Sequence, residues 1–540
     1  MSGVGERGLS RSPTSGDVPR NVGPLFITLL IISPAASPAV AIWAGNVAQV
    51  PKVYRLVIVV GLFALVGAVV FWILRRVFSE SRVAAFITFF VVLALSSGGK
   101  VLSDGPWIWK WVAALVVVSL VGAIVLRLRH WWLLDALLAA GSAALLLPGL
   151  ISGTWDSLSR DEPAPVAASS DRVPEMTRRP DIMLVVLDGY TSLPVVRELF
   201  GHEDPDLQHD LAAHGFELIE PVFSAYPMTH LSVSSLLELD YTSTEAHSMV
   251  TEDGRSLSQV IGGANELVGI LSGNGYRITM VEPGWHMSTC GDRIDVCVSD
   301  PFIDEGVGAV LSQGLAWSLL ESSTGSAFTH GAIHAMDRTL AYAAEAGHNQ
   351  VADFLFAHIL VPHPPLYLDA SCNVVPDRRL DGINMGVAGA SAETTRIRLE
   401  GYANQVRCVD RFVRALAHEL DGTDSLVFIV GDHGSDVMEQ LSTVPDNWSE
   451  PQILERMSVF LAVKAPPGCQ NGSSLVTVPL FRSLIACSGG LDLEPIGETA
   501  YLVSQAEVDG ERAEMRPLAE SELEHLASCL PEVGEHLECD

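Results

Sequence analysis

The pattern of apolar and polar positions divides the chain into two parts of different character. The first part contains five apolar stretches, each approaching the roughly 20 residues that a helix needs to cross a bilayer. The expected spans are Pro24–Ala44, Leu56–Leu74, Val83–Ser97, Trp107–Leu126 and Trp131–Ile151. We therefore predict an α-helical membrane domain of about five transmembrane helices at residues 1–151.

After the spans, the chain alternates between strand-length and helix-length patterns. A polar segment rich in Pro, Ala and Ser at residues 152–179 is typical of a linker. Short, wholly apolar runs beyond it predict strands at Ile182–Leu187, Arg277–Val281, Phe354–Leu360, Leu426–Val430 and Ser458–Val463. Helical patterns separate them, among others at Leu257–Leu271, Met336–Ala346 and Glu393–Leu420. Strands that are apolar throughout favour a sheet covered by helices on both faces, so we predict an α/β domain at 180–505 and an acidic C-terminal tail at 506–540.

Charge and cysteine content separate the two parts further. Up to Trp155 the chain has 12 Lys+Arg and 5 Asp+Glu, a net of +7, which leaves 21 basic and 59 acidic residues, a net of −38. The acidic part would repel a phosphate backbone, so we expect no nucleic-acid partner. All eight cysteines lie in this part without a CxxC spacing, which favours disulfides in an oxidising compartment over unpaired thiols in a cytosolic domain. Pairing of sequence neighbours, such as Cys290 with Cys297 and Cys529 with Cys539, fits the spacing, although sequence does not establish the connectivity.

Basic residues between the spans predict the orientation of the membrane domain. They gather before the first span, after the second and after the fourth, as Arg7, Arg11, Arg20, Arg75, Arg76, Arg82, Arg127 and Arg129. Because such residues stay on the cytoplasmic side, an odd number of spans places everything after Ile151 outside. The cysteines predict the same side independently.

Two features within the predicted spans are unfavourable in lipid unless other groups interact with them. Asp135 near the start of the last span is costly in lipid unless it reaches the interface or a partner. Pro34 and Pro38 in the first span predict a kink, which is tolerable if adjacent helices cover the carbonyls that it frees.

Candidate ligands stand at the ends of three predicted strands, where open α/β sheets gather their ligands. Asp188 directly follows the first strand, and Asp432-His433 follows the strand at Leu426–Val430. His358 and His363 lie at and after the end of a third strand. Carboxylate and imidazole side chains together suit a divalent metal ion. Taken singly, Asp188 also fits a turn and the histidines fit satisfied polar residues near a turn.

Thr229 is the candidate nucleophile. The chain reads as a loop that enters a helix at this residue, so its hydroxyl would face unpaired N–H groups and the positive end of the helix, which favours an alkoxide or a bound anion. The alternative is that Thr229 only caps the helix.

Order and spacing make these segments resemble one family. Leu187-Asp188-Gly189-Tyr190, the Thr229 region and Gly431-Asp432-His433-Gly434 are similar to the alkaline-phosphatase superfamily in its sulfatase-like branch. Within it, residues 180–490 look closest to the membrane-anchored lipoteichoic-acid synthase and phosphoethanolamine transferase type. The resemblance implies an alkaline-phosphatase/sulfatase-like fold in which Asp188, Thr229, Asp432 and His433 bind a divalent metal, zinc or manganese. It also implies a catalytic role for His363 at the substrate phosphate or leaving group, and His358 is the weaker candidate for this contact.

The motifs also depart from that family. The nucleophile region is Pro227-Met228-Thr229-His230, without the Cys or Ser of the C/S-x-P-S-R motif of sulfatases proper, and Gly284 stands where a sulfatase motif has Lys. These departures favour phosphoryl chemistry through a threonine. Asp188 stands where the lipoteichoic-acid synthases carry Glu, so their substrate is not carried over.

The resemblance therefore predicts an enzyme of phosphate or sulfate esters in a bacterial-type plasma membrane. Its catalytic domain would be extracytoplasmic and would move a phospho-head group from a membrane lipid to a cell-envelope acceptor. Two alternatives remain open, an extracytoplasmic sulfatase or phosphodiesterase of soluble esters and an inactive envelope scaffold.

Overall fold

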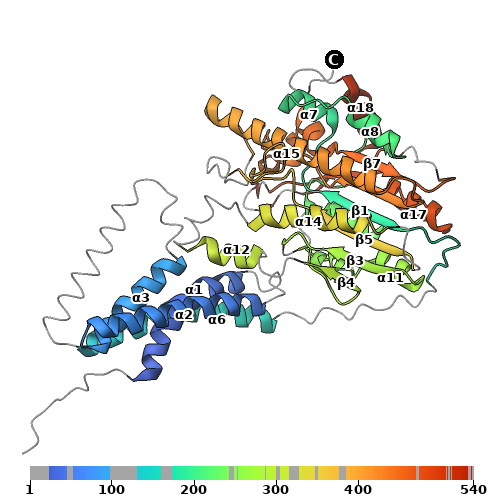
Figure 1. Ribbon diagram of the computed structural model, residues 1–540. Coiled ribbons are helices and arrows are strands. Elements are labelled where there is room, and N and C mark those ends of the chain that lie inside the picture. The colour runs from blue at the N-terminus through green and yellow to red at the C-terminus, as the bar shows by residue number, and fades with distance from the viewer. Residues whose placement is uncertain are drawn as a thin grey trace, which may run out of the picture. The chain divides into compact units, whose positions relative to one another are not determined.

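The computed structural model describes residues 23–45, 53–97, 131–159, 173–242, 249–251, 253–285, 287–299, 305–314, 327–346, 351–375, 385–469, 474–505, 507–508, 511–512, 514–532 and 537. The chain divides into two compact units, an N-terminal helical unit and an α/β unit (Figure 1). The long apolar helices of the first are α1 (Pro24–Gly45), α2 (Val53–Val77), α3 (Ser81–Ser97) and α6 (Trp131–Ser159).

Three helices of the helical unit are long and apolar enough to cross a membrane, at Pro24–Ala44, Val53–Val77 and Leu138–Trp155. They overlap three of the five predicted spans, and only the first has the predicted limits. The helix at Ser81–Ser97 is apolar but shorter, and the predicted span Trp107–Leu126 lies outside the described residues. The count of five spans therefore stays a prediction.

The proline-containing segment of the first span and Asp135 in the last both have a partner on α3. Pro38 has no N–H to donate to the carbonyl of Pro34 four residues earlier, and the hydroxyl of Ser96 on α3 donates to this carbonyl instead, at 2.8 Å. The carboxylate of Asp135 on α6 lies 3.1 Å from a guanidinium nitrogen of Arg82 on α3. Adjacent helices thus provide the partners that lipid cannot.

The α/β unit is built on a seven-stranded sheet in the order β2-β7-β6-β1-β5-β3-β4. Its strands are β1 (Ile182–Leu187), β2 (Glu217–Leu218), β3 (Arg277–Val281), β4 (Val296–Val298), β5 (Asp353–Ile359), β6 (Leu426–Gly431) and β7 (Leu461–Lys464). From β6 through β1, β5 and β3 to β4 the pairing is parallel, whereas β7 is antiparallel to both β6 and β2. Two small two-stranded sheets pair β8 (Ala500–Leu502) with β11 (Arg516–Leu518), and β9 (Glu507–Val508) with β10 (Glu511–Arg512).

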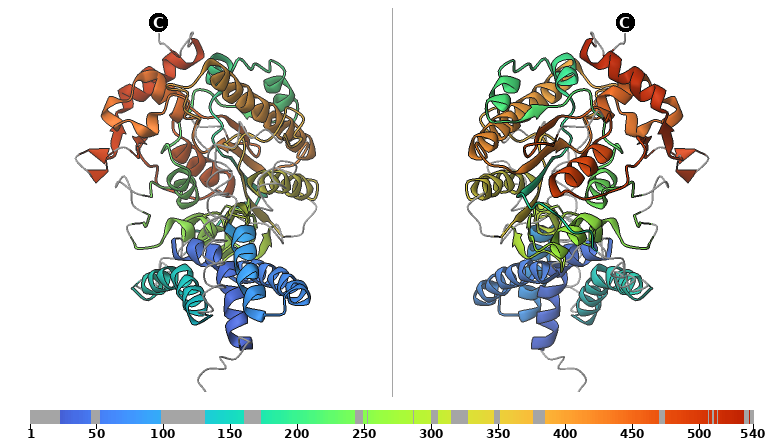
Figure 2. Two further views of the ribbon diagram at one scale, coloured as in Figure 1. Left: turned by 90° about the vertical axis from the view of Figure 1, so that its left-hand side faces the viewer. Right: turned by 90° about the vertical axis from the view of Figure 1, so that its right-hand side faces the viewer.

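Helices cover both faces of the seven-stranded sheet, as Figure 2 shows. The even-numbered side chains of β1 join a core with α9 (Thr229–Glu238), α10 (Leu257–Ile261), α11 (Glu266–Gly273), α16 (Glu450–Met457), α17 (Thr477–Gly489) and α18 (Glu520–Cys529). The odd-numbered side chains join a second core with α7 (Leu193–Phe200), α8 (Leu207–Ala213), α14 (Ala327–Ala343) and α15 (Ala392–Glu419). A further helix, α12, spans Glu305–Ser312. The expected mixed sheet between helices is therefore present, because strands buried on both faces need cover on both.

Several elements differ from the sequence prediction in their limits. The helix expected at Leu257–Leu271 is two helices, because α10 ends at Ile261 with Gly262 as its C-cap, and Asn265 caps α11 through its side chain. The strand expected from Ser458 begins only at Leu461, since the residues before it form isolated bridges. In the C-terminal segment, leucines of α18 join the first core.

Three disulfides join Cys290 to Cys297, Cys372 to Cys408 and Cys469 to Cys487. The first is a pair suggested from the sequence. Cys529 is also disulfide-bonded, and its expected partner, Cys539, lies outside the described residues.

Candidate metal centre

Asp188 and Asp432 meet because their strands are parallel neighbours. The last residue of β1, Leu187, stands opposite the last residue of β6, Gly431, so both aspartates leave the sheet at the same edge. The N–H groups of Gly189 and His433 donate to Oδ1 of Asp432, at 2.9 and 3.0 Å. This carboxylate therefore has one fixed oxygen, and its other oxygen, Oδ2, is left for a ligand.

Asp188, Asp432 and His433 form a buried cluster with the spacing of a metal site. One ligand atom from each lies within 4.8 Å of the others. Nε2 of His433 is 3.3 Å from Oδ2 of Asp432 and 3.7 Å from Oδ1 of Asp188. Both oxygens are buried without a hydrogen-bond partner among the described residues. Buried polar atoms are normally hydrogen-bonded. A divalent cation bound between these two carboxylate oxygens and Nε2 of His433 would give both oxygens a partner.

The orientation of the His433 ring also suits a ligand. Its Nδ1 lies 2.9 Å from the carbonyl oxygen of Gly434, which makes Nδ1 the donor and leaves a lone pair on Nε2. Burial lowers the pKa of His433 well below its usual range, and the charge of Arg456 lowers it further. The ring is therefore neutral, as a metal ligand must be.

The two carboxylates have different electrostatic surroundings. Burial raises the pKa of Asp432 well above its usual range, and the charge of Asp188 acts in the same direction. Burial would also raise the pKa of Asp188, but the neighbouring imidazoles of His363 and His358 outweigh it, so this pKa is lowered. A cation between the two carboxylates would relieve their repulsion.

Thr229 brings a hydroxyl into the same cluster. It is the first residue of α9, and the capping position before it belongs to Met228, which makes no side-chain capping bond. The Thr229 hydroxyl lies 2.9 Å from Nε2 of His433. The simple capping role that the sequence left open is therefore wrong, and the hydroxyl faces the candidate ligands at the N-terminus of a helix.

His363 and His358 both lie close to Asp188. The N–H of His363 donates to the carbonyl oxygen of Asp188 at 2.8 Å, and the His363 ring centroid is 6.4 Å from that of His433. His358 is fully buried in β5, with Nε2 3.6 Å from Oδ2 of Asp188. Ser288 contacts the opposite ring nitrogen of His358 at 2.9 Å. His363 borders a cavity of about 80 Å³ that a substrate group could enter.

Residues that the sequence did not single out hold this site together. The Glu455 carboxylate accepts the N–H groups of Val437 and Met438 and the hydroxyl of Ser435, which shapes the loop after His433. Such groups give no signal in the sequence, because their partners are mostly backbone atoms of a distant loop.

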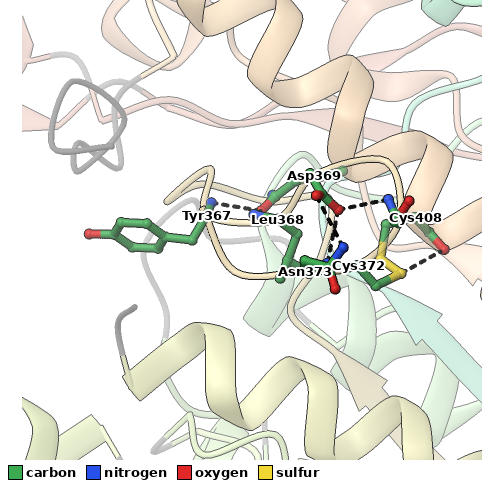
Figure 3. The surroundings of a disulfide bond; sticks show 8 residues. Tyr367, Leu368, Asp369, Cys372, Asn373 and Cys408 are labelled. Atoms are coloured by element: carbon green, nitrogen blue, oxygen red, sulfur yellow. Dashed lines mark hydrogen bonds between the residues drawn. A yellow bond between two sulfur atoms is a disulfide. The ribbon is translucent and has the colours of Figure 1, made fainter. Parts of the chain in front are cut away.

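A disulfide fixes the loop that follows His363, as Figure 3 shows. Cys372 in this loop is bonded to Cys408 on α15. The loop closes around the carboxylate of Asp369, which accepts the N–H groups of Ser371 and Asn373 at 2.8 and 2.9 Å. The segment that begins at His363 therefore has a defined course over α15.

The chain was also compared with known proteins. Residues 180–461, more than half of the chain, match the family model described as Sulfatase. No curated protein sequence matches the chain. Similar solved structures include the integral membrane protein lipooligosaccharide phosphoethanolamine transferase A (EptA) from Neisseria meningitidis, 14% identical over 83% of this chain and 89% of that one, with a TM-score of 0.35. They also include the C-terminal periplasmic domain of EcEptC from Escherichia coli, 11% identical over 65% and 97%, TM-score 0.39. A putative sulfatase from Bacteroides thetaiotaomicron is 15% identical over 60% and 73%, TM-score 0.39.

Proposed function

Because this chain belongs to the sulfatase family, and is thus an enzyme of sulfate or phosphate esters, we propose that it is a membrane-anchored, metal-dependent phosphotransferase. In this proposal it moves a phospho-head group from a membrane lipid to a cell-envelope acceptor, with Thr229 as nucleophile. The catalytic domain lies on the extracytoplasmic side. The disulfides of the α/β unit support that side, because they persist in oxidising compartments.

One observation carries the proposal. A threonine hydroxyl at a helix N-terminus lies 2.9 Å from a neutral imidazole nitrogen. Two buried carboxylate oxygens, which have no hydrogen-bond partner in the part of the chain that the structure describes, lie 3.3 and 3.7 Å from the same nitrogen. A threonine that served only the fold would have no reason to face this cluster.

The residues that would hold the metal are Asp188, Asp432 and His433, together with the oxygen of Thr229. Mixed oxygen and nitrogen ligands suit zinc or manganese. When bound, such an ion supplies positive charge that activates the hydroxyl and stabilises oxygen charge in the transition state.

Thr229, the start of α9 and His363 each have a separate role in the transfer step. Oγ1 of Thr229 forms a bond to phosphorus while the bond from phosphorus to the lipid oxygen breaks. The first N–H groups of α9 face the phosphate oxygens and favour their negative charge. His363, at the cavity, gives a proton to the leaving oxygen. In net terms, the hydroxyl proton of Thr229 ends on the leaving alcohol.

The second step reverses the first with a different alcohol. A hydroxyl of the acceptor attacks phosphorus, the bond from phosphorus to Thr229 breaks, and the acceptor proton restores the threonine hydroxyl. His363 regains a proton from Thr229 in the first step, so in the second step it gives one to Thr229 and takes up that of the acceptor. Apolar helices long enough to cross a membrane would confine enzyme and lipid donor to one surface, which raises their effective concentration.

The test is the intact mass of the full-length protein in detergent after incubation with bacterial lipid extract and a divalent metal. We expect a discrete added mass on the unaltered chain and on Thr477→Ala, but not on Thr229→Ala. Thr477 is the matched control, because it is likewise the first residue of a helix, α17, and its buried hydroxyl has no partner among the described residues. An adduct that survives Thr229→Ala would refute the assigned nucleophile.

A second candidate, a hydrolase of soluble phosphate or sulfate esters, is favoured by the match to the sulfatase family model. Turnover of a soluble aryl ester without lipid, with no adduct formed from lipid extract, would support it over transfer.

A further inference from the structure

The guanidinium group of Arg456 joins two loops that are far apart in the sequence. Arg456 lies in the last turn of α16 and is 5% exposed. Its Nε donates to the carbonyl oxygen of Pro227 at 2.8 Å, and Nη2 donates to the same oxygen. Its Nη1 donates to the carbonyl oxygen of Gly434 at 2.7 Å.

These two carbonyls adjoin the reacting groups. Pro227 is two residues before Thr229, in the loop that leads into α9. Gly434 follows His433, and its carbonyl oxygen also lies 2.9 Å from Nδ1 of that histidine. In the backbone, the N–H of Gly434 donates to the carbonyl oxygen of Arg456 at 2.7 Å. Arg456 therefore holds the peptide on both sides of the contact between Thr229 and His433.

Only an arginine has the shape for this arrangement. Its planar fork of five N–H groups can donate to two separate carbonyls at once, whereas lysine carries one compact ammonium. Burying a cation costs free energy unless hydrogen bonds replace its water, and here three hydrogen bonds from the fork do so. Replacement by lysine would leave at least one carbonyl without its partner.

We propose that Arg456 is a positioning residue that fixes the Thr229 hydroxyl against Nε2 of His433. In the structure it contacts neither of these atoms and acts through the carbonyls of Pro227 and Gly434. The inference rests on the proposed function in one respect, because the reaction that it assists is transfer through Thr229. The clamp between the two loops is a property of the fold and can be measured without turnover.

The test compares Arg456→Lys with Arg414→Lys in the full-length protein in detergent. Arg414 is the matched control, because it also donates through Nε and Nη2, but to Asp210 in α8 and Asp204 just before it, which lie outside the loops of the site. Turnover of bis-p-nitrophenyl phosphate with added zinc or manganese is measured beside amide hydrogen exchange of the peptide 224–231. For Arg456→Lys we expect kcat to fall about 100-fold with little change in KM, since small displacements of reacting groups have effects of this size.

Exchange and chemical rescue separate positioning from general stability. In Arg456→Lys the peptide 224–231 should exchange about tenfold faster than in the unaltered chain, and in Arg414→Lys it should not. Methylguanidinium should raise the kcat of Arg456→Ala but not of Arg414→Ala, because Arg456 borders the cavity beside His363.

The results test the positioning role of Arg456 and the proposed function separately. Faster exchange with unchanged kcat, or unchanged exchange with unchanged kcat, would overturn Arg456 as a positioning residue. If the unaltered chain shows no turnover that depends on Thr229, the proposed function fails. Exchange alone then decides whether Arg456 clamps the two loops.

Discussion

The amide of Gln405 gives the sharpest quantitative prediction. This α15 side chain is 1% exposed and makes four hydrogen bonds to one backbone segment. Its nitrogen donates to the carbonyl oxygens of Pro362 and His363, at 3.0 and 3.1 Å, and its oxygen accepts the N–H groups of Tyr367 and Leu368, at 3.1 and 3.2 Å. The amide thus fixes the backbone at and after the proposed proton donor.

Replacement by alanine would remove all four partners at once. An unsatisfied buried backbone group costs about 1–3 kcal/mol, and water entering beside the half-buried His363 would satisfy part of the set. We therefore expect Gln405→Ala to lower the free energy of unfolding by about 3–6 kcal/mol, a large share of the usual total. The unfolding midpoint should fall by roughly 5–10 °C. Because His363 loses its backbone support, kcat should fall about tenfold as well.

The assay is thermal unfolding of the full-length protein, with Asn404→Ala as control. Asn404 is the preceding residue on the same helix, and its amide oxygen accepts a hydrogen bond from Arg407, at 3.0 Å. We expect the control to change the free energy of unfolding by about 1 kcal/mol or less. If both variants lower the midpoint equally and kcat is unchanged, the reasoning from the four bonds is refuted.

Gln405→Glu adds a pH dependence with a definite sign. The new carboxyl keeps one acceptor oxygen, but when ionised it faces two carbonyl oxygens and must be buried, so its folded-state pKa is raised. Stability is then greatest at low pH and is lost as pH rises through that pKa. Midpoints that rise with pH in this variant, relative to the unaltered chain, would contradict the bonding pattern.

Three further predictions concern the rest of the chain. In the chain-entropy treatment, removing the disulfide with Cys372→Ala and Cys408→Ala should lower the free energy of unfolding by about 4 kcal/mol, and Cys290→Ala with Cys297→Ala should lower it by about 2 kcal/mol. The first loss is larger because the sequence separations are 36 and 7. The order of the two unfolding midpoints checks this prediction. A chelator should abolish turnover and lower the unfolding midpoint, and added zinc or manganese should restore both; a midpoint indifferent to metal would count against the cation. Burial raises the pKa of Glu220 from 4.5 to about 7. This carboxyl should therefore contribute at most about 3 kcal/mol to the free energy of unfolding. The contribution is present at low pH and is lost as pH rises from 4.5 to about 7. The midpoint of Glu220→Gln should fall less than that of the unaltered chain between these pH values.

Much of the α/β unit could be predicted because its strands are apolar on both faces. Ile182–Leu187 is wholly buried and forms β1 with the expected limits. The prediction of ligands at strand ends needed only that Asp188 and Asp432 follow such runs. That these two strands are neighbours did not follow, since β1 and β6 are more than 200 residues apart in the sequence.

Other features depended on contacts that no local pattern encodes. The direction of the Thr229 hydroxyl is decided by His433, which lies 204 residues further along the chain. The break between α10 and α11 follows from Gly262 and the cap at Asn265, which a hydrophobic pattern read over 15 positions obscures. Apolar periodicity reports which face is buried, and it says little about where a helix stops.

The residues that sequence reasoning missed have one physical property in common. Arg456, Gln405 and Glu455 are buried polar side chains that bond mainly to backbone atoms of the loops carrying the site. A carbonyl or an N–H looks the same whatever the residue, so such a bond places no requirement on the sequence of its partner. The ligand positions are therefore readable from their residue types, whereas the scaffold that aims them is visible only in three dimensions. Substitutions at these three positions should accordingly change how the site is held while its ligand residues stay intact.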